Sequence, residues 1–240
     1  MNIAIILAGG VGARVGAGVP KQFIEVLGKP IMAYTLEKFQ NNANIDAIEI
    51  VCLASHEQQI KDIVTKYGIT KTRWYTHGGD TFQKSTMNGI TNLKGKIAAD
   101  DIVLIGFAVA PLVSDEILDD CIRVCKQYGN AVPADDMIMC TCIRDADGLG
   151  TTKGIVRETL AGFNGPWTFK FGDVLSAYET AVERGILDSI EPHTTSLMLE
   201  LGHKIYFAKS ATTNIKITKK EDLDIFEGLL LLEQKRKGLL

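Results

Sequence analysis

The sequence lacks a long apolar run and any excess of positive charge. Its first apolar stretch, Ile3 to Leu7, is far shorter than the roughly 18 residues that a membrane-spanning helix needs. A formal net charge of −3 argues against a general nucleic-acid partner, because such proteins are usually basic. No cationic leader precedes Ile3, so we expect no secretory signal and a cytoplasmic location, with neither a membrane nor a nucleic acid as partner.

Cysteine is also scarce, with five residues and no Cys-x-x-Cys pair. Cys121 and Cys125 are four apart in an expected helix, and Cys140 and Cys142 flank one residue of an expected strand. These spacings do not match common metal sites, and no histidine lies nearby in sequence. We therefore expect buried, reduced thiols that pack as small apolar side chains rather than a metal centre.

Linkers and internal repeats are absent too, and the composition, 46% hydrophobic and 23% charged, is that of an ordinary globular protein. Apolar runs and amphipathic segments alternate along the chain, which predicts an α/β fold with a Rossmann-like, doubly wound, mostly parallel sheet. Residues 137–156 break this rhythm with short β-like pieces around a polar turn. We expect one domain over residues 1–240 with a hairpin arm at 137–156, and further strands at 204–208 and 214–217.

A glycine-rich turn follows the first expected strand. Ile3 to Leu7 has no polar face, which is typical of a buried strand, and residues 8–12 read Ala-Gly-Gly-Val-Gly. Such a loop exposes backbone N–H groups, and Arg14 and Lys21 come soon after it. Small residues, N–H donors and cations at the carboxyl end of a strand suit a polyphosphate ligand.

Two ligands fit this loop on its own. A dinucleotide turn requires a G-x-G-x-x-G pattern, but position 15 is Val, and no acidic residue ends the second expected strand at 47–53. A nucleoside triphosphate would instead account for Arg14 and Lys21 as cations facing the phosphates. The loop alone leaves both readings open.

Four further motifs occur in order along almost the whole chain. They are Gly-Gly-Asp-Thr-Phe-Gln-Lys-Ser at 78–85, Val-Leu-Ile-Gly-Phe-Ala-Val-Ala-Pro at 103–111, Val-Arg-Glu at 156–158, and Asn-Ile-Lys-Ile-Thr at 214–218 followed by Glu-Asp-Leu at 221–223. Together with residues 7–14 and Pro-Lys-Gln-Phe at 20–23, they resemble the cytidylyltransferases that act on 2-C-methyl-D-erythritol 4-phosphate and ribitol 5-phosphate.

This resemblance implies a GT-A-like nucleotidyltransferase fold, a homodimer joined through the arm, and transfer of CMP from CTP to a small polyol phosphate with Mg²⁺. It assigns catalytic roles to Arg14, Lys21 and Lys216. The nucleotide would contact Leu7, Ala8, Gly9, Gly10, Val11, Gly12, Gly78, Gly79, Asp80 and Ser85. The acceptor side would comprise Phe107, Ala110, Asp136, Thr213 and, from across the dimer, Arg157.

The acceptor side departs from the family pattern. Phe107 stands where the family has the aspartate that helps to bind Mg²⁺, so the metal ligands stay unassigned. Ala110 and Phe82 each replace an arginine. We expect either an altered acceptor, nearer the ribitol branch or an undefined polyol phosphate, or a CTP-binding protein without transferase activity. A nicotinamide-dependent dehydrogenase is a third and weaker hypothesis.

Overall fold

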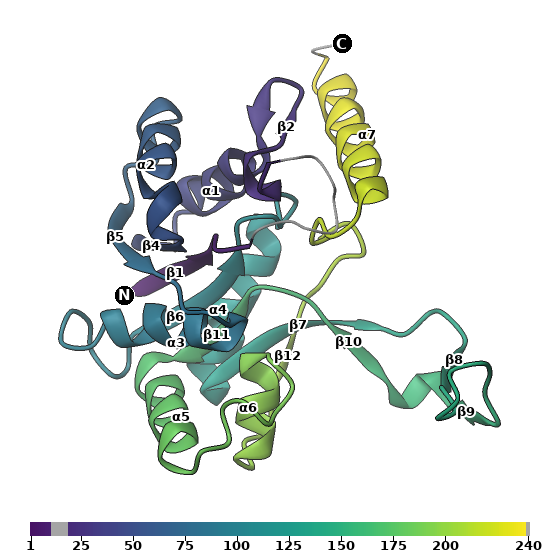
Figure 1. The fold of residues 1–240 in the computed structure, drawn as a ribbon. Helices are drawn as coiled ribbons and strands as arrows, with labels where there is room; N and C mark the ends of the chain where they lie inside the picture. Colours follow the sequence, from purple (N-terminus) through teal and green to yellow (C-terminus); the bar gives the residue numbers. More distant parts are fainter. Residues whose placement is uncertain (11–18, 239–240) are drawn as a thin grey trace.

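The computed structural model describes residues 1–10 and 19–238. Its centre is an eight-stranded sheet in the order β10-β7-β11-β6-β1-β4-β5, with β12 paired to β7 (Figure 1). The strands are β1 Asn2–Leu7, β4 Ala47–Cys52, β5 Thr72–His77, β6 Ile102–Phe107, β7 Asn130–Asp136, β10 Ala161–Phe163, β11 Trp167–Lys170 and β12 Phe207–Ala208. Strands β1, β4, β5 and β6 run parallel, whereas β11 is antiparallel to both β6 and β7. The expected α/β fold with a mostly parallel sheet is confirmed.

Helices cover both faces of the sheet. They are α1 Ile31–Asn41, α2 Glu57–Lys66, α3 Phe82–Asn92, α4 Asp115–Tyr128, α5 Phe171–Glu183, α6 Thr194–Glu200 and α7 Lys220–Arg236. Alternate residues of β1 enter different cores: Ile3 and Ile5 pack in a cluster with residues of α3, α5 and α6, while Ala4 and Ile6 pack in a second cluster with residues of α1, α2 and α4. A strand that is buried on both faces explains the unbroken apolar run at the start of the sequence.

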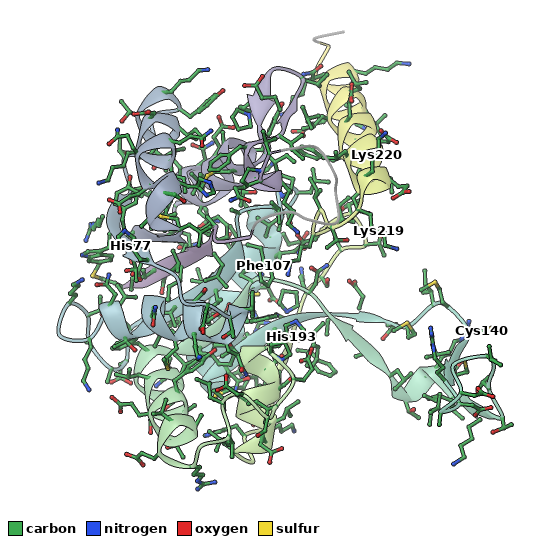
Figure 2. All side chains as sticks on the ribbon, viewed as in Figure 1. His77, Phe107, Cys140, His193, Lys219 and Lys220 are labelled. Atoms are coloured by element: carbon green, nitrogen blue, oxygen red, sulfur yellow. The ribbon has the colours of Figure 1, made fainter. Side chains whose placement is uncertain are left out.

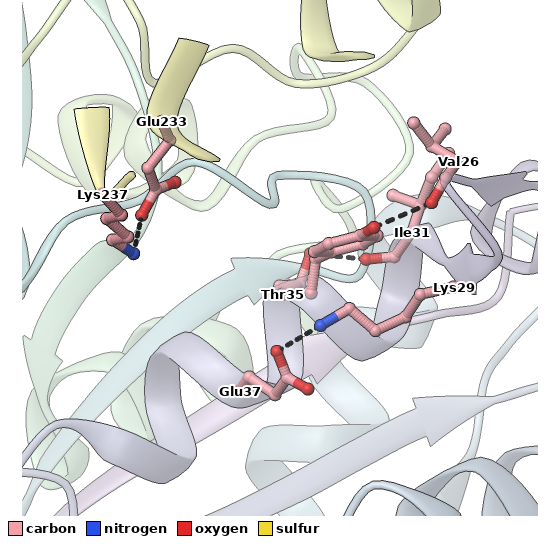
Figure 3. Close-up of polar contacts among 8 residues, drawn as sticks. Val26, Lys29, Ile31, Thr35, Glu37, Glu233 and Lys237 are labelled. Carbon is pink, nitrogen blue, oxygen red and sulfur yellow. Dashed lines mark hydrogen bonds and ion pairs between the residues drawn. The ribbon is translucent and has the colours of Figure 1, made fainter. Parts of the chain in front are cut away.

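The short hairpin of β2 (Glu25–Val26) and β3 (Lys29–Pro30) leads directly into α1. The Tyr34 hydroxyl donates to the Val26 carbonyl at 2.7 Å, and the Lys29 ammonium donates to Glu37 at 2.6 Å (Figure 3). These contacts hold the hairpin against the helix. They fix the position of the segment that immediately precedes α1.

A two-stranded hairpin projects from the body, as expected for residues 137–156. Strands β8 (Thr141–Ile143) and β9 (Lys153–Ile155) pair only with each other and lie far from the main sheet (Figure 1). The expectation of buried thiols holds for Cys52, Cys121 and Cys125 but is wrong for Cys140 and Cys142, which are exposed. A two-stranded hairpin has no second layer to cover its faces, so apolar side chains on it stay in contact with solvent.

Two other expectations are corrected near the C-terminus. The strand expected at 204–208 is only Phe207–Ala208, and residues 214–217 form no strand. Ile217 N donates to the Val109 carbonyl at 2.8 Å, and Asn214 instead bonds through its side-chain amide to Gly165 O at 2.7 Å. The segment is therefore anchored by separate contacts with different partners, which explains why an apolar pattern typical of a strand occurs without a ladder.

Within the described part of the chain, no helix combines the length and the apolar character that crossing a membrane demands.

Candidate active site

A cavity of about 320 Å³ opens at the carboxyl ends of the parallel strands. Leu7, the last residue of β1, is in register with Phe107, the last residue of β6, and Cys52 at the end of β4 is in register with His77 at the end of β5. Because parallel strands end at the same edge of a sheet, the loops that follow them meet there. This alignment places segments separated by 100 residues or more in sequence around one cavity.

The cavity brings together most of the predicted nucleotide-side residues that the structure describes. Its lining includes Leu7, Ala8, Gly9, Gly10, Lys21, Gly79, Asp80, Ser85, Phe107 and Lys216. Three further predicted residues, Val11, Gly12 and Arg14, lie outside the described residues. Lys21 and Lys216 come from opposite ends of the chain, and both line this cavity.

The start of the glycine-rich loop is fixed by the sheet. Ala8 N donates to the Val51 carbonyl at 2.7 Å, and Ala8 O accepts from the Gln22 side-chain amide at 3.0 Å. Gln22 is buried, and the Pro-Lys-Gln-Phe motif at 20–23 does not by itself indicate a role for this residue. Its amide fastens the first part of the loop to the segment that carries Lys21.

The turn after β5 is held by Ser85 of α3. Gly79 N donates to the Ser85 hydroxyl at 3.1 Å, and that hydroxyl donates to Thr81 O at 2.9 Å. A Cβ on Gly79 would lie 2.5 Å from the Lys84 Cβ, and one on Gly78 would lie 2.8 Å from the Ser85 Oγ. The two glycines are therefore required for close approach to α3. Gly78 itself does not line the cavity.

The segment that carries Lys216 is anchored at several points. The Lys21 ammonium donates to Ile217 O at 3.1 Å. Because Ile217 directly follows Lys216, this hydrogen bond ties Lys21 to the segment that carries the other catalytic candidate. Just beyond, Asp222 Oδ2 accepts from Thr218 N at 2.6 Å and from Lys219 N at 2.8 Å. Burial acts to raise the pKa of Asp222, but these hydrogen bonds outweigh it and the pKa is lowered.

An aromatic cluster lies beside Lys216, and no motif in the sequence predicted it. Phe107 packs edge-on to Trp167 with ring centroids 5.2 Å apart and lies 6.0 Å from Phe82. His193 contacts both Trp167 and Phe82 edge-on, at 5.2 and 6.0 Å. Figure 2 shows Phe107 at the centre of the molecule and His193 on the side of α6. The only signal in the sequence was the pair of aromatics in place of charged residues.

Other predicted acceptor residues lie outside the lining of this cavity. Ala110 is buried behind Phe107, beside a small void. Asp136 ends β7 and is exposed, as is Thr213. Arg157 follows the projecting arm, where its guanidinium donates to Ile138 O at 3.0 Å and to Glu158 at 3.2 Å. Their roles stay predictions, and Arg157 would need a second protomer to reach a cavity.

The described lining does not fit a magnesium site built from protein ligands. Its one carboxylate, Asp80, is 75% exposed and ion-paired with Lys84 at 3.2 Å. Nowhere in residues 1–10 and 19–238 do three or more His, Cys, Asp or Glu side chains gather in a group able to hold a metal. Mg²⁺ in proteins is usually held by one or two carboxylates together with substrate phosphates and water.

Comparison with known proteins identifies the family. The model of the 2-C-methyl-D-erythritol 4-phosphate cytidylyltransferase family matches residues 2–231. A ribitol-5-phosphate cytidylyltransferase of Lacticaseibacillus paracasei is 38% identical over 96% of this chain and 98% of its own length. A 2-C-methyl-D-erythritol 4-phosphate cytidylyltransferase of Clostridium acetobutylicum is 36% identical over 96% of this chain and 97% of its own.

A solved structure agrees. The 4-diphosphocytidyl-2C-methyl-D-erythritol synthase of Anaerococcus prevotii superposes with a TM-score of 0.80 and 25% identity, covering 97% of this chain and 96% of that one. The fold, the ordered motifs and the matched length agree with one another. The chain therefore belongs to the 2-C-methyl-D-erythritol 4-phosphate cytidylyltransferase family and is a CTP-dependent nucleotidyltransferase by descent.

Proposed function

We propose that this protein transfers CMP from CTP to a small polyol phosphate, with ribitol 5-phosphate as the preferred acceptor. The observation that carries the proposal is the convergence of Lys21, Lys216, the Ala8–Gly10 loop and the Gly79–Ser85 turn on one cavity. Small residues and backbone N–H groups suit the phosphates, and two ammonium groups suit their charge. The 38% identity to a protein named ribitol-5-phosphate cytidylyltransferase supports the choice of acceptor.

The reaction requires little from the protein beyond positioning the two substrates and stabilising negative charge at the α-phosphate. A phosphate oxygen of the acceptor attacks the α-phosphorus of CTP, the new P–O bond forms, and the bond to the β-phosphate breaks to release pyrophosphate. The attacking oxygen is already anionic near neutral pH, so no strong general base is required. Lys21 and Lys216 are proposed to stabilise the negative charge that builds up at the α-phosphate.

A divalent metal is expected from the family, and we propose that any Mg²⁺ accompanies the nucleotide rather than occupying a site of protein ligands. The single, exposed and ion-paired carboxylate of Asp80 supports this view. We also propose that the nucleotide contacts Leu7–Gly10, Gly79, Asp80 and Ser85. Residues 1–240 would act as one catalytic domain.

A binding protein without transferase activity is the second candidate, favoured by Phe82 and Phe107 where the family has charged residues. One experiment separates the two. Pyrophosphate release is measured with CTP, Mg²⁺ and a panel containing ribitol 5-phosphate, 2-C-methyl-D-erythritol 4-phosphate and other polyol phosphates. We expect release with ribitol 5-phosphate at the highest kcat/KM. CTP binding by calorimetry with no release on any acceptor would establish the binding protein instead.

We also propose that the arm joins two copies of the chain. Its apolar side chains are strongly exposed, with Leu149 91%, Ile138 74%, Met139 70% and Val156 66% accessible. A clustered apolar surface of this kind marks an interaction site. Light scattering at micromolar concentration should give a mass about twice 26.2 kDa.

The double substitution Ile138→Asp and Leu149→Asp should shift the dimer toward monomer without lowering the melting temperature of the body, because neither side chain packs in either core. Asp147→Asn, on the same arm, is the control and should leave the mass unchanged. A monomeric wild-type protein would contradict the proposal.

A further inference from the structure

The ammonium of Lys216 lies on the face of an aromatic ring. Its Nζ is 3.7 Å from the centroid of Phe107 and 5.6 Å from that of Phe82. The two rings are tilted by 31° to each other, so the cation has one ring face close by and a second within reach. Both distances are within the roughly 6 Å over which a ring face attracts a cation.

The ring of Phe107 is itself held firmly. It is 6% exposed and packs edge-on to Trp167, which is 5% exposed, at an interplanar angle of 86°. On another side it approaches Gly165, where an added Cβ would lie 3.0 Å from Phe107 Cε2. A ring enclosed in this way keeps one orientation, so the position of the cation above it is defined as well.

We propose that Phe107 is a positioning residue that holds the Lys216 ammonium inside the cavity through a cation–π contact, with Phe82 as a second and weaker face. A ring attracts a cation without carrying a formal charge. It therefore restrains the ammonium without placing a negative charge beside its positive charge. A carboxylate at the same place would compete with the phosphate for that charge.

The consequence for turnover rests on the proposed function. Phe107→Leu keeps an apolar side chain but removes the ring face, and it should lower kcat about ten-fold with little change in KM for CTP, since the contact positions Lys216 for the transition state. Phe107→Tyr retains a ring face and should recover most of the loss. Phe169→Leu, the same replacement in the buried part of β11, is the control and should leave kcat unchanged.

A variant that keeps the shape of the Phe107 side chain separates an effect on the ring's negative face from an effect on folding. Replacement of Phe107 by 3,4,5-trifluorophenylalanine keeps the ring but weakens its negative face, so kcat should fall while the melting temperature stays at the wild-type value. If Phe107→Leu and the fluorinated variant both retain wild-type kcat, the positioning role is overturned.

A second readout does not require turnover. Reductive methylation with ¹³C-formaldehyde labels the lysines, and the Lys216 signal is the one that disappears in Lys216→Arg. In the wild-type protein that signal should be shifted upfield by the ring current of Phe107, and in Phe107→Leu it should move to the position of exposed lysines. An unshifted signal in the wild-type protein would overturn the contact itself. A shifted signal in a protein that turns over no acceptor would refute the proposed function and leave the contact intact.

Discussion

Lys216→Ala is expected to lower kcat/KM about a hundred- to thousand-fold, and Lys21→Ala is expected to have an effect of similar size. Each removes a cation from the cavity that would stabilise charge at the α-phosphate, a loss that typically costs roughly 3–4 kcal/mol of transition-state stabilisation. Steady-state kinetics with saturating acceptor would measure kcat and the KM for CTP separately. A fall mainly in kcat identifies an interaction made in the transition state.

The control for this pair is Lys209→Ala. Lys209 is ion-paired with Glu116 at 2.6 Å, but it is 61% exposed and does not line the cavity. Its removal changes the net charge by the same amount and should leave kcat/KM unchanged. The melting temperatures of all three variants should stay within a few degrees of the wild type. Equal loss of thermal stability in Lys21→Ala and Lys216→Ala would count against catalytic roles.

The second large effect concerns Glu49, a carboxylic acid buried in the central sheet. Glu49 lies on β4 with no exposed surface, and one of its oxygens accepts from Thr76 Oγ1 at 2.6 Å and Asn92 Nδ2 at 2.7 Å. Burial disfavours the charged form and raises the pKa of Glu49 from 4.5 to about 7, against the opposing effect of these two hydrogen bonds. Its second oxygen has no hydrogen-bond partner among residues 1–10 and 19–238.

The sign of the pH dependence follows from this shift. Between pH 4.5 and about 7 the folded protein retains a proton on Glu49 that the unfolded chain has lost. The contribution of Glu49 to stability is thus fully present below pH 4.5 and is lost as the pH rises through 7. A shift of this size corresponds to roughly 3 kcal/mol, at about 1.4 kcal/mol per pKa unit.

Glu49→Gln tests this directly, because an amide of the same shape stays neutral at every pH. The variant should equal the wild type in free energy of unfolding near pH 4.5 and exceed it by a few kcal/mol at pH 8, as measured by urea denaturation at several pH values. Glu183→Gln, at an exposed position of α5, is the matched control. Parallel pH profiles for Glu49→Gln and the wild type would contradict the assignment.

Local patterns were sufficient for most of the architecture. The apolar run at 3–7 predicted a strand buried on both faces, and β1 packs residues into both cores. Ser114 followed by two acidic residues is a pattern typical of a helix start, and its hydroxyl accepts from Ile117 N at 3.3 Å to cap α4. The prediction of a strand was wrong at 214–217. The alternating apolar residues there lie in a segment held by hydrogen bonds to the loop after β6 and to Gly165, and the segment does not pair with a neighbouring strand.

For the site, the sequence by itself indicated the candidate residues: a glycine-rich turn, two lysines and a serine, recognised through motifs in a set order. Their positions in space depended on the tertiary structure, because parallel strands end at one edge of the sheet and bring residues 7, 79, 107 and 216 around one cavity. The contact between the Lys216 ammonium and the aromatic rings likewise depends on tertiary packing. Phe82, Phe107 and Trp167 are far apart along the chain, and only the fold packs the three rings together and places Phe82 and Phe107 beside the ammonium. A motif can show that charged residues have been replaced, but contacts between distant segments decide what the replacements do.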